Sequence, residues 1–150
     1  MAQGPEVTVR LPPGCPPEID AEELRQRLLL AIEASGAEVA RLHVEVVDDA
    51  AMDAYHRKHS GVAGTTDVLT FLASEPDEAI EVDIVACLDE ATRRGAEFGH
   101  GPARELLLYG VHGLLHCMGH DDHDPAAFER MHAEEDRILR SIGIGATFRP

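Results

Sequence analysis

The sequence is poor in cysteine, in aromatic residues and in positive charge, and it contains no long apolar run. Its three cysteines, Cys15, Cys87 and Cys117, form no CxxC pair, which argues against a disulfide framework and against a cysteine-based zinc site. No apolar run approaches the roughly 18 residues that cross a bilayer. The N-terminus also lacks the basic-then-apolar pattern of a signal peptide. We therefore expect a cytoplasmic protein that has no membrane partner.

Positive charge is scarce as well: 13 Lys and Arg face 28 Asp and Glu, a net charge of −15 at pH 7. Such a balance disfavours non-specific binding to DNA or to other polyanions, and we expect no DNA partner. A local basic patch or a bound divalent cation would still create a positive site where it is needed. The charge thus disfavours a general polyanion binder and leaves a local binding site open.

What is present fits a globular protein of ordinary size. The chain has 150 residues, of which 44% are hydrophobic and 27% charged. These values are typical of one soluble domain, and no composition break divides the chain. We therefore expect residues 1–150 to form a single domain.

Alternating apolar residues predict four strands, at residues 7–9, 42–47, 67–71 and 80–87. Helical periodicity and capping residues predict five helices, at residues 21–35, 49–59, 88–98, 102–118 and 125–141. Asp20 and Asp124 are the expected N-caps, and Gly36 and Gly119 mark helix ends. The expected fold class is α+β: a single small mixed β-sheet of about four strands with helices packed over it.

Two histidines in the C-terminal half carry the strongest chemical signal. His112 and His116 lie four residues apart in an expected helix, so both imidazoles project from one face. This spacing lets two ring nitrogens reach one zinc ion at ~2.0–2.1 Å. An isolated pair of this kind is more often surface or core filler, but four histidines fall within residues 112–123. The cluster therefore predicts a metal site, with an open position for a catalytic water if three protein ligands bind.

The third ligand is expected after Gly119, where the chain turns back toward the helix. In HExxHxxGxxH zinc sites the glycine matches Gly119, and the third histidine falls at the position of Asp122. His123 lies one residue beyond. Nitrogen is the commoner ligand, so the pattern favours His123, with Asp122 as the alternative. Gly113 stands where those enzymes have the glutamate that acts as general base, so the sequence assigns no catalytic residue apart from a zinc-bound water.

Residues 112–123, HGLLHCMGHDDH, resemble the H-G-x-L-H-L-x-G-Y-D-H signature of the YbeY-type endoribonucleases, the ribosomal RNA maturation factors of bacteria. Further blocks follow in that family's order: TDVLTF at 66–71 resembles T-D-V-L-S-F, VDIVAC at 82–87 resembles G-D-I-x-I-C, and FERM at 128–131 with ILRSIG at 138–143 resembles E-x-x-M and I-L-x-x-L-G. Together these blocks cover most of residues 42–143.

The resemblance implies an α+β metal-dependent hydrolase that acts on single-stranded RNA in ribosomal RNA processing and ribosome quality control. Its expected partners are ribosomal RNA and ribosomal proteins. It also implies one zinc per chain on the histidines that match the family's three, His112, His116 and His123. One extra residue, Asp121 or Asp122, precedes the last of these, which leaves the choice of third ligand open.

A second departure concerns RNA binding. The family often has an arginine six residues before the threonine of T-D-V-L, and this chain has Ser60 there. If that arginine holds phosphate in relatives, another base must take its place. Arg57 and Lys58 are the nearest candidates, and we expect them to contact RNA.

Other polar residues have two interpretations each. Asp67 either caps the start of a strand or orients a metal-bound imidazole. Asp83, between Val82 and Ile84, is expected to face solvent by alternation, the alternative being that it points at the site. The last-helix acids are expected to form a solvated face, and the remaining histidines to lie at the surface or at helix ends. These acids are Glu134, Glu135 and Asp136, and these histidines are His43, His56, His59, His100 and His132.

Two other functions compete with RNA cleavage. A metallopeptidase or amidase would share the histidine helix and glycine, but Gly113 in place of glutamate counts against it. A non-catalytic ribosome assembly factor would use zinc only to stabilise the fold. For RNA cleavage itself, both a zinc-activated water and the 2′-OH of RNA are available nucleophiles.

Overall fold

The computed structural model describes residues 4–60, 66–120 and 123–144. Its elements follow the order β1 (Glu6–Arg10), α1 (Ala21–Ser35), β2 (Val39–Val47), α2 (Asp49–Ser60), β3 (Val68–Leu72), β4 (Ile80–Cys87), α3 (Leu88–Glu97), α4 (Pro102–Cys117) and α5 (Pro125–Ser141). The four strands and five helices expected from the sequence are confirmed, with bounds that differ by a few residues. The fold class is α+β.

All four strands join one mixed sheet in the order β1-β2-β4-β3. The strands β1, β2 and β4 run parallel, and β3 is antiparallel to β4, with Thr70 opposite Ile84. A short turn between Leu72 and Ile80 joins β3 to β4. As the last strand in the order, β3 is an edge strand, and its outer backbone groups take no part in the sheet.

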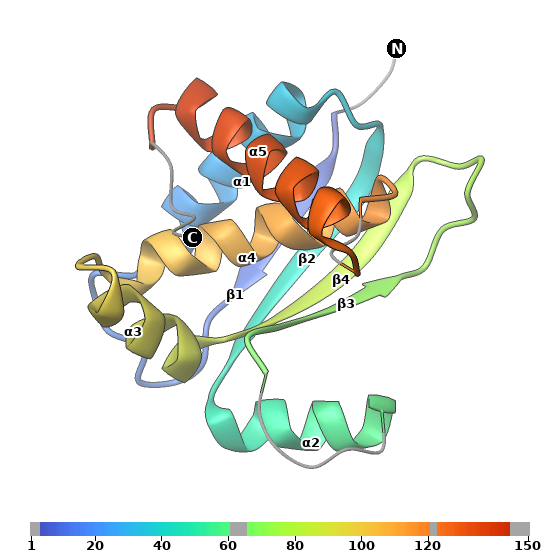
Figure 1. Cartoon of the computed structure of the whole chain (residues 1–150). Coiled ribbons are helices and arrows are strands. Elements are labelled where there is room, and N and C mark those ends of the chain that lie inside the picture. The colour runs from blue at the N-terminus through green and yellow to red at the C-terminus, as the bar shows by residue number, and fades with distance from the viewer. Residues whose placement is uncertain (1–3, 61–65, 121–122, 145–150) are drawn as a thin grey trace.

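Helices cover the two faces of the sheet unequally: α1, α4 and α5 lie on one face and α2 on the other (Figure 1). Because side chains alternate along a strand, Leu42 and Val82 point toward the main core beneath α1, α4 and α5. Val47 and Val85 point the other way and pack with Met52 of α2 in a smaller cluster. The sheet therefore separates α2 from α4.

Capping residues begin and end helices at the positions that the sequence predicts. The Asp20 carboxylate accepts hydrogen bonds from the backbone N–H groups of Glu22 and Glu23 at 2.9 and 3.2 Å. Gly36 and Gly119 adopt φ angles of 75° and 98°, a region that favours glycine. None of the helices within the described ranges is long and apolar enough to cross a bilayer.

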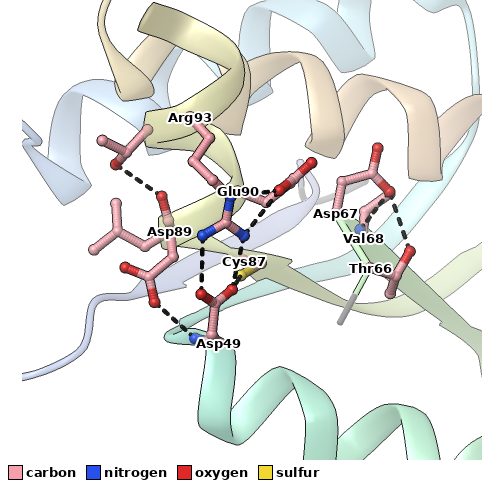
Figure 2. A network of polar contacts seen from close by, with 10 residues as sticks. Asp49, Thr66, Asp67, Val68, Cys87, Asp89, Glu90 and Arg93 are labelled. Atoms are coloured by element: carbon pink, nitrogen blue, oxygen red, sulfur yellow. Dashed lines mark hydrogen bonds and ion pairs between the residues drawn. The ribbon is translucent and has the colours of Figure 1, made fainter. Parts of the chain in front are cut away.

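A polar network joins the first turn of α2 to α3 (Figure 2). The Arg93 guanidinium donates two hydrogen bonds of 2.9 Å to the Asp49 carboxylate and a third, also 2.9 Å, to Glu90. The backbone N–H of Asp49 in turn donates to Asp89 at 2.7 Å. The hydrogen bonds from Arg93 lower the pKa of the Asp49 carboxyl. This network fixes where α2 starts below the sheet.

Candidate metal centre

The helix α4 lies directly against the sheet at Gly113. A Cβ atom at this position would lie 2.7 Å from Ile84 Cδ1 and 3.1 Å from Thr70 Oγ1. A larger side chain therefore meets the sheet and not open space. This packing explains why the HExxH glutamate has no counterpart here: position 113 faces the sheet, while His112 and His116 project from another side of α4.

His112 and His116 project from one face of α4, as the spacing predicts. Their Nε2 atoms lie 3.1 Å apart, and the rings meet edge to face with centroids 4.6 Å apart. Two nitrogens bound to one tetrahedral zinc ion at ~2.0–2.1 Å would be separated by roughly 3.3 Å. The pair is half-buried, and its donor atoms and spacing fit a shared metal ion.

The described residues supply two candidate ligands but not a third. Within residues 4–60, 66–120 and 123–144, no three or more His, Cys, Asp or Glu side chains gather in a metal-binding arrangement. His123 is exposed and precedes Asp124, the N-cap of α5, whose carboxylate accepts from Ala127 N–H at 2.9 Å. Asp122, with Asp121, lies outside the described residues. The choice between His123 and Asp122 therefore stays a prediction.

A buried carboxylate from α5 contacts His112, one of the two histidines of the pair. Glu135 Oε1 lies 3.4 Å from His112 Nδ1 and 2.7 Å from His132 Nδ1, and Glu135 is only 1% exposed. The expectation that Glu135 belongs to a solvated face is wrong, because α5 turns this side onto α4. The sequence did contain a signal: Met131, Glu135 and Ile138 follow the spacing of a buried helical stripe.

His100 lies at a helix end, between α3 and α4, as the sequence predicts, whereas His132 lies inside α5 with a largely buried side chain, so its expected place at the surface or a helix end is wrong. The His132 ring stacks on His112, with centroids 6.3 Å apart and an interplanar angle of 28°. His100 Nε2 lies 2.8 Å from Glu105 Oε1, and Glu105 is 2% exposed. Each histidine lies beside a buried carboxylate, a contact that local spacing along the chain does not reveal.

Two hollows meet at His112 and Asp67. The first, of about 180 Å³, lies between α3, α4 and α5 and is bordered by Arg94 and Phe128. The second, of about 520 Å³, runs along β3 past His116. The histidine pair thus lies in the wall of an open groove beside an edge strand.

Asp67 is exposed at the mouth of these hollows. Its Oδ1 accepts hydrogen bonds from Val68 N–H at 2.8 Å and from the Thr66 hydroxyl at 3.4 Å (Figure 2). These contacts match the capping interpretation, and an orienting role for Asp67 stays a prediction. Asp83 behaves as alternation predicts: it faces away from the core and binds Arg41 through two hydrogen bonds of 3.0 and 3.3 Å.

The expected RNA-contacting residues lie on α2, across the sheet from α4 (Figure 1). Arg57 is exposed, and its Nε donates to Asp53 Oδ2 at 3.0 Å. Lys58 borders a separate groove of about 530 Å³ together with Tyr55 and Phe71. The structure does not bring these cations together with the histidine pair, so a role in RNA binding stays a prediction.

Similarity to known proteins points to one protein family. The family model described as endoribonuclease YbeY matches residues 17–143. Endoribonuclease YbeY of Moorella thermoacetica is 34% identical over 139 residues, covering 82% of this chain and 89% of the relative. That of Halorhodospira halophila is 37% identical over 131 residues, covering 83% and 84%.

A solved structure agrees in fold. The solution structure of TM1509 from Thermotoga maritima matches with a TM-score of 0.59 at 22% identity, covering 91% of this chain and 89% of that one. At this identity the match supports the α+β architecture alone.

Proposed function

The chain belongs to the YbeY endoribonuclease family, and from that membership we propose that it is a zinc-dependent endoribonuclease specific for single-stranded RNA. We place it, as one domain, in ribosomal RNA maturation and ribosome quality control in the cytoplasm, with ribosomal RNA and ribosomal proteins as partners. The observation that carries the proposal is the 3.1 Å separation of His112 Nε2 and His116 Nε2 in the wall of an open groove.

One zinc per chain would be held by His112, His116 and His123, with Asp122 as the alternative third ligand. A bound zinc would supply Lewis acidity, which polarises a phosphoryl oxygen and acidifies a water molecule. Water and the RNA 2′-OH are both available as the nucleophile.

The chain's own part is to hold the strand at the histidines. The groove runs along β3, an edge strand with outward backbone N–H and C=O groups that sugar and phosphate oxygens or hydroxyls can contact. A duplex is too wide and rigid to lay one backbone this closely along a strand edge, whereas a single strand adapts to it. This difference supports the proposed preference for single-stranded RNA.

The test compares cleavage of a single-stranded oligoribonucleotide, the same sequence as a duplex, and casein. Wild-type protein should cleave the single strand and spare the other two. The cleavage rate of His116→Ala should fall by more than the roughly 10–100-fold that is typical when a hydrogen-bond partner of a metal ligand is lost. His56→Ala, on α2, is the control and should cleave like wild type.

Other outcomes point to the competing functions. Cleavage of casein but not RNA would support a metallopeptidase. Bound zinc with no cleavage of either polymer would support an assembly factor with a structural metal.

A further inference from the structure

We infer that Glu135 is a positioning residue of the metal site, whose carboxylate holds His112 in the rotamer and tautomer that direct Nε2 at the metal. The inference rests on the proposed zinc site and extends it to α5, which carries no expected metal ligand. Glu135 contacts His112 through Oε1, at 3.4 Å from Nδ1.

The two nitrogens of His112 have different neighbours. Nδ1 faces the Glu135 carboxylate, and Nε2 faces His116 Nε2 at 3.1 Å. A neutral imidazole carries its proton on one nitrogen only. Because an ionised carboxylate accepts hydrogen bonds and cannot donate, it favours the proton on Nδ1. The lone pair is then on Nε2, the atom that the metal would use.

A second histidine, His132 of α5, lies beside the same carboxylate. His132 Nδ1 lies 2.7 Å from Glu135 Oε1, while its ring stacks on His112 and meets Phe128 edge to face at 4.2 Å between centroids. Glu135 and His132 are one helical turn apart, so α5 holds both the ring and the Nδ1 edge of His112. This contact fixes one metal-facing side chain of α4 against a neighbouring helix.

The burial of Glu135 is costly for folding. In the described ranges its carboxylate contacts His112 and His132 but no lysine or arginine, and no donor in those ranges reaches its buried Oε2 atom. Its neighbours on the stripe, Met131 and Ile138, are fully buried and apolar. A leucine at position 135 would continue this stripe without the desolvation cost of a carboxylate. Packing alone therefore gives no reason for a glutamate, whereas orientation of His112 does.

The test is a zinc titration of metal-free protein against a chromophoric chelator, combined with thermal unfolding of the metal-free chains. Glu135→Gln and Glu135→Leu should weaken zinc binding by about 10–100-fold, with leucine at least as severe because it removes both charge and acceptor. The unfolding midpoint of metal-free Glu135→Leu should equal or exceed that of wild type. Glu134→Gln is the matched control: it alters the adjacent acid, which pairs with Arg137, and should bind zinc like wild type.

The opposite pattern, wild-type zinc affinity with a lowered unfolding midpoint, would make Glu135 a structural residue and overturn the inference. A measurement on unaltered protein covers the case in which a variant does not fold. Histidine ¹⁵N shifts of metal-free wild type should show His112 protonated on Nδ1 and unprotonated on Nε2. The Nε2-protonated form would overturn the inference.

The same titration separates this inference from the proposed function. If wild type binds no zinc, or His116→Ala binds it equally well, the metal site itself is wrong. If wild type binds zinc, His116→Ala loses it and both Glu135 variants keep it, only the positioning role fails.

Discussion

His112 and His116 share one face of α4. His112 contacts Glu135 and stacks on His132, both from α5, and His116 Nε2 lies 3.1 Å from His112 Nε2. The sequence predicts the pair, because two residues four apart on one helix lie on the same face. The burial of Glu135 is harder to predict from the sequence. Its spacing from Met131 and Ile138 fits a buried stripe, but the acidic residues on either side of it make the helix face look exposed to solvent.

The identity of the third metal ligand can be tested by substitution. If His123 binds the metal, His123→Ala should weaken zinc binding by more than the roughly 10–100-fold of a lost outer partner. Asp122→Ala should have the smaller effect, because nitrogen is the commoner ligand in such sites. Competition with a chelator measures both. The reverse ranking would assign the role to Asp122.

Elements are positioned by close packing and by polar ties between them. The sheet alternation and the helix caps at Asp20 and Asp124 follow from local sequence, and the structure confirms them. Strand order and the location of α2 across the sheet from α4 do not follow from it, because they depend on which apolar faces meet at long range. For the same reason the sequence could not show that Arg57 and Lys58 lie on the face opposite the histidines.

The close approach of α4 to the sheet makes Gly113→Glu a test of that packing. The substitution would introduce the glutamate of HExxH sites, but we expect no peptidase activity. The new side chain overpacks the contact with Ile84 and buries an unpaired carboxylate, so the free energy of unfolding should fall by about 3 kcal/mol or more. Chemical denaturation measures this. The control Ala133→Glu, on the exposed side of α5, should change it by less than about 0.5 kcal/mol. A stable Gly113→Glu protein that cleaves casein would contradict the packing.

The Asp49–Arg93 ion pair between α2 and α3 should make the stability of the fold depend on pH. Hydrogen bonds from Arg93 lower the pKa of Asp49 below its ordinary value of 3.8, so the folded state favours the ionised carboxylate. Its contribution is therefore present at neutral pH and lost as the pH falls below about 4. Asp49→Asn should lower the free energy of unfolding by no more than about 1 kcal/mol at pH 7, because the Asp49–Arg93 pair is largely exposed, and by less at pH 3. Denaturation at both pH values measures this, with Asp77→Asn in the β3–β4 turn as control. An equal loss at both would exclude the ion pair as its cause.

The whole molecule carries a net charge of −15, yet its family acts on RNA. Local attraction must then come from a bound cation and a few basic side chains, and few phosphates are contacted. The salt dependence of binding should be shallow, with a log–log slope of about −1 to −3 for a single-stranded oligonucleotide. Arg57→Ala with Lys58→Ala should flatten it, since α2 would supply part of that attraction.

A matched loss of two charges controls for net charge. Arg25→Ala with Arg27→Ala removes two cations from α1, each paired with a neighbouring glutamate, and should leave the slope unchanged. A steep slope that the α2 substitutions do not alter would place the RNA-binding surface elsewhere.

The central claim is that one metal ion on the histidines of α4 is required for RNA cleavage. Its most direct test is reconstitution: the chain is stripped of metal with a chelator, and the cleavage rate of a single-stranded oligoribonucleotide is measured as zinc is returned. We predict that the rate rises in proportion to added zinc and levels off at about one zinc per chain, the number a single catalytic site of this type binds. His116→Ala should show no rise. Full cleavage by the stripped protein, or a wild-type response in His116→Ala, would contradict the claim.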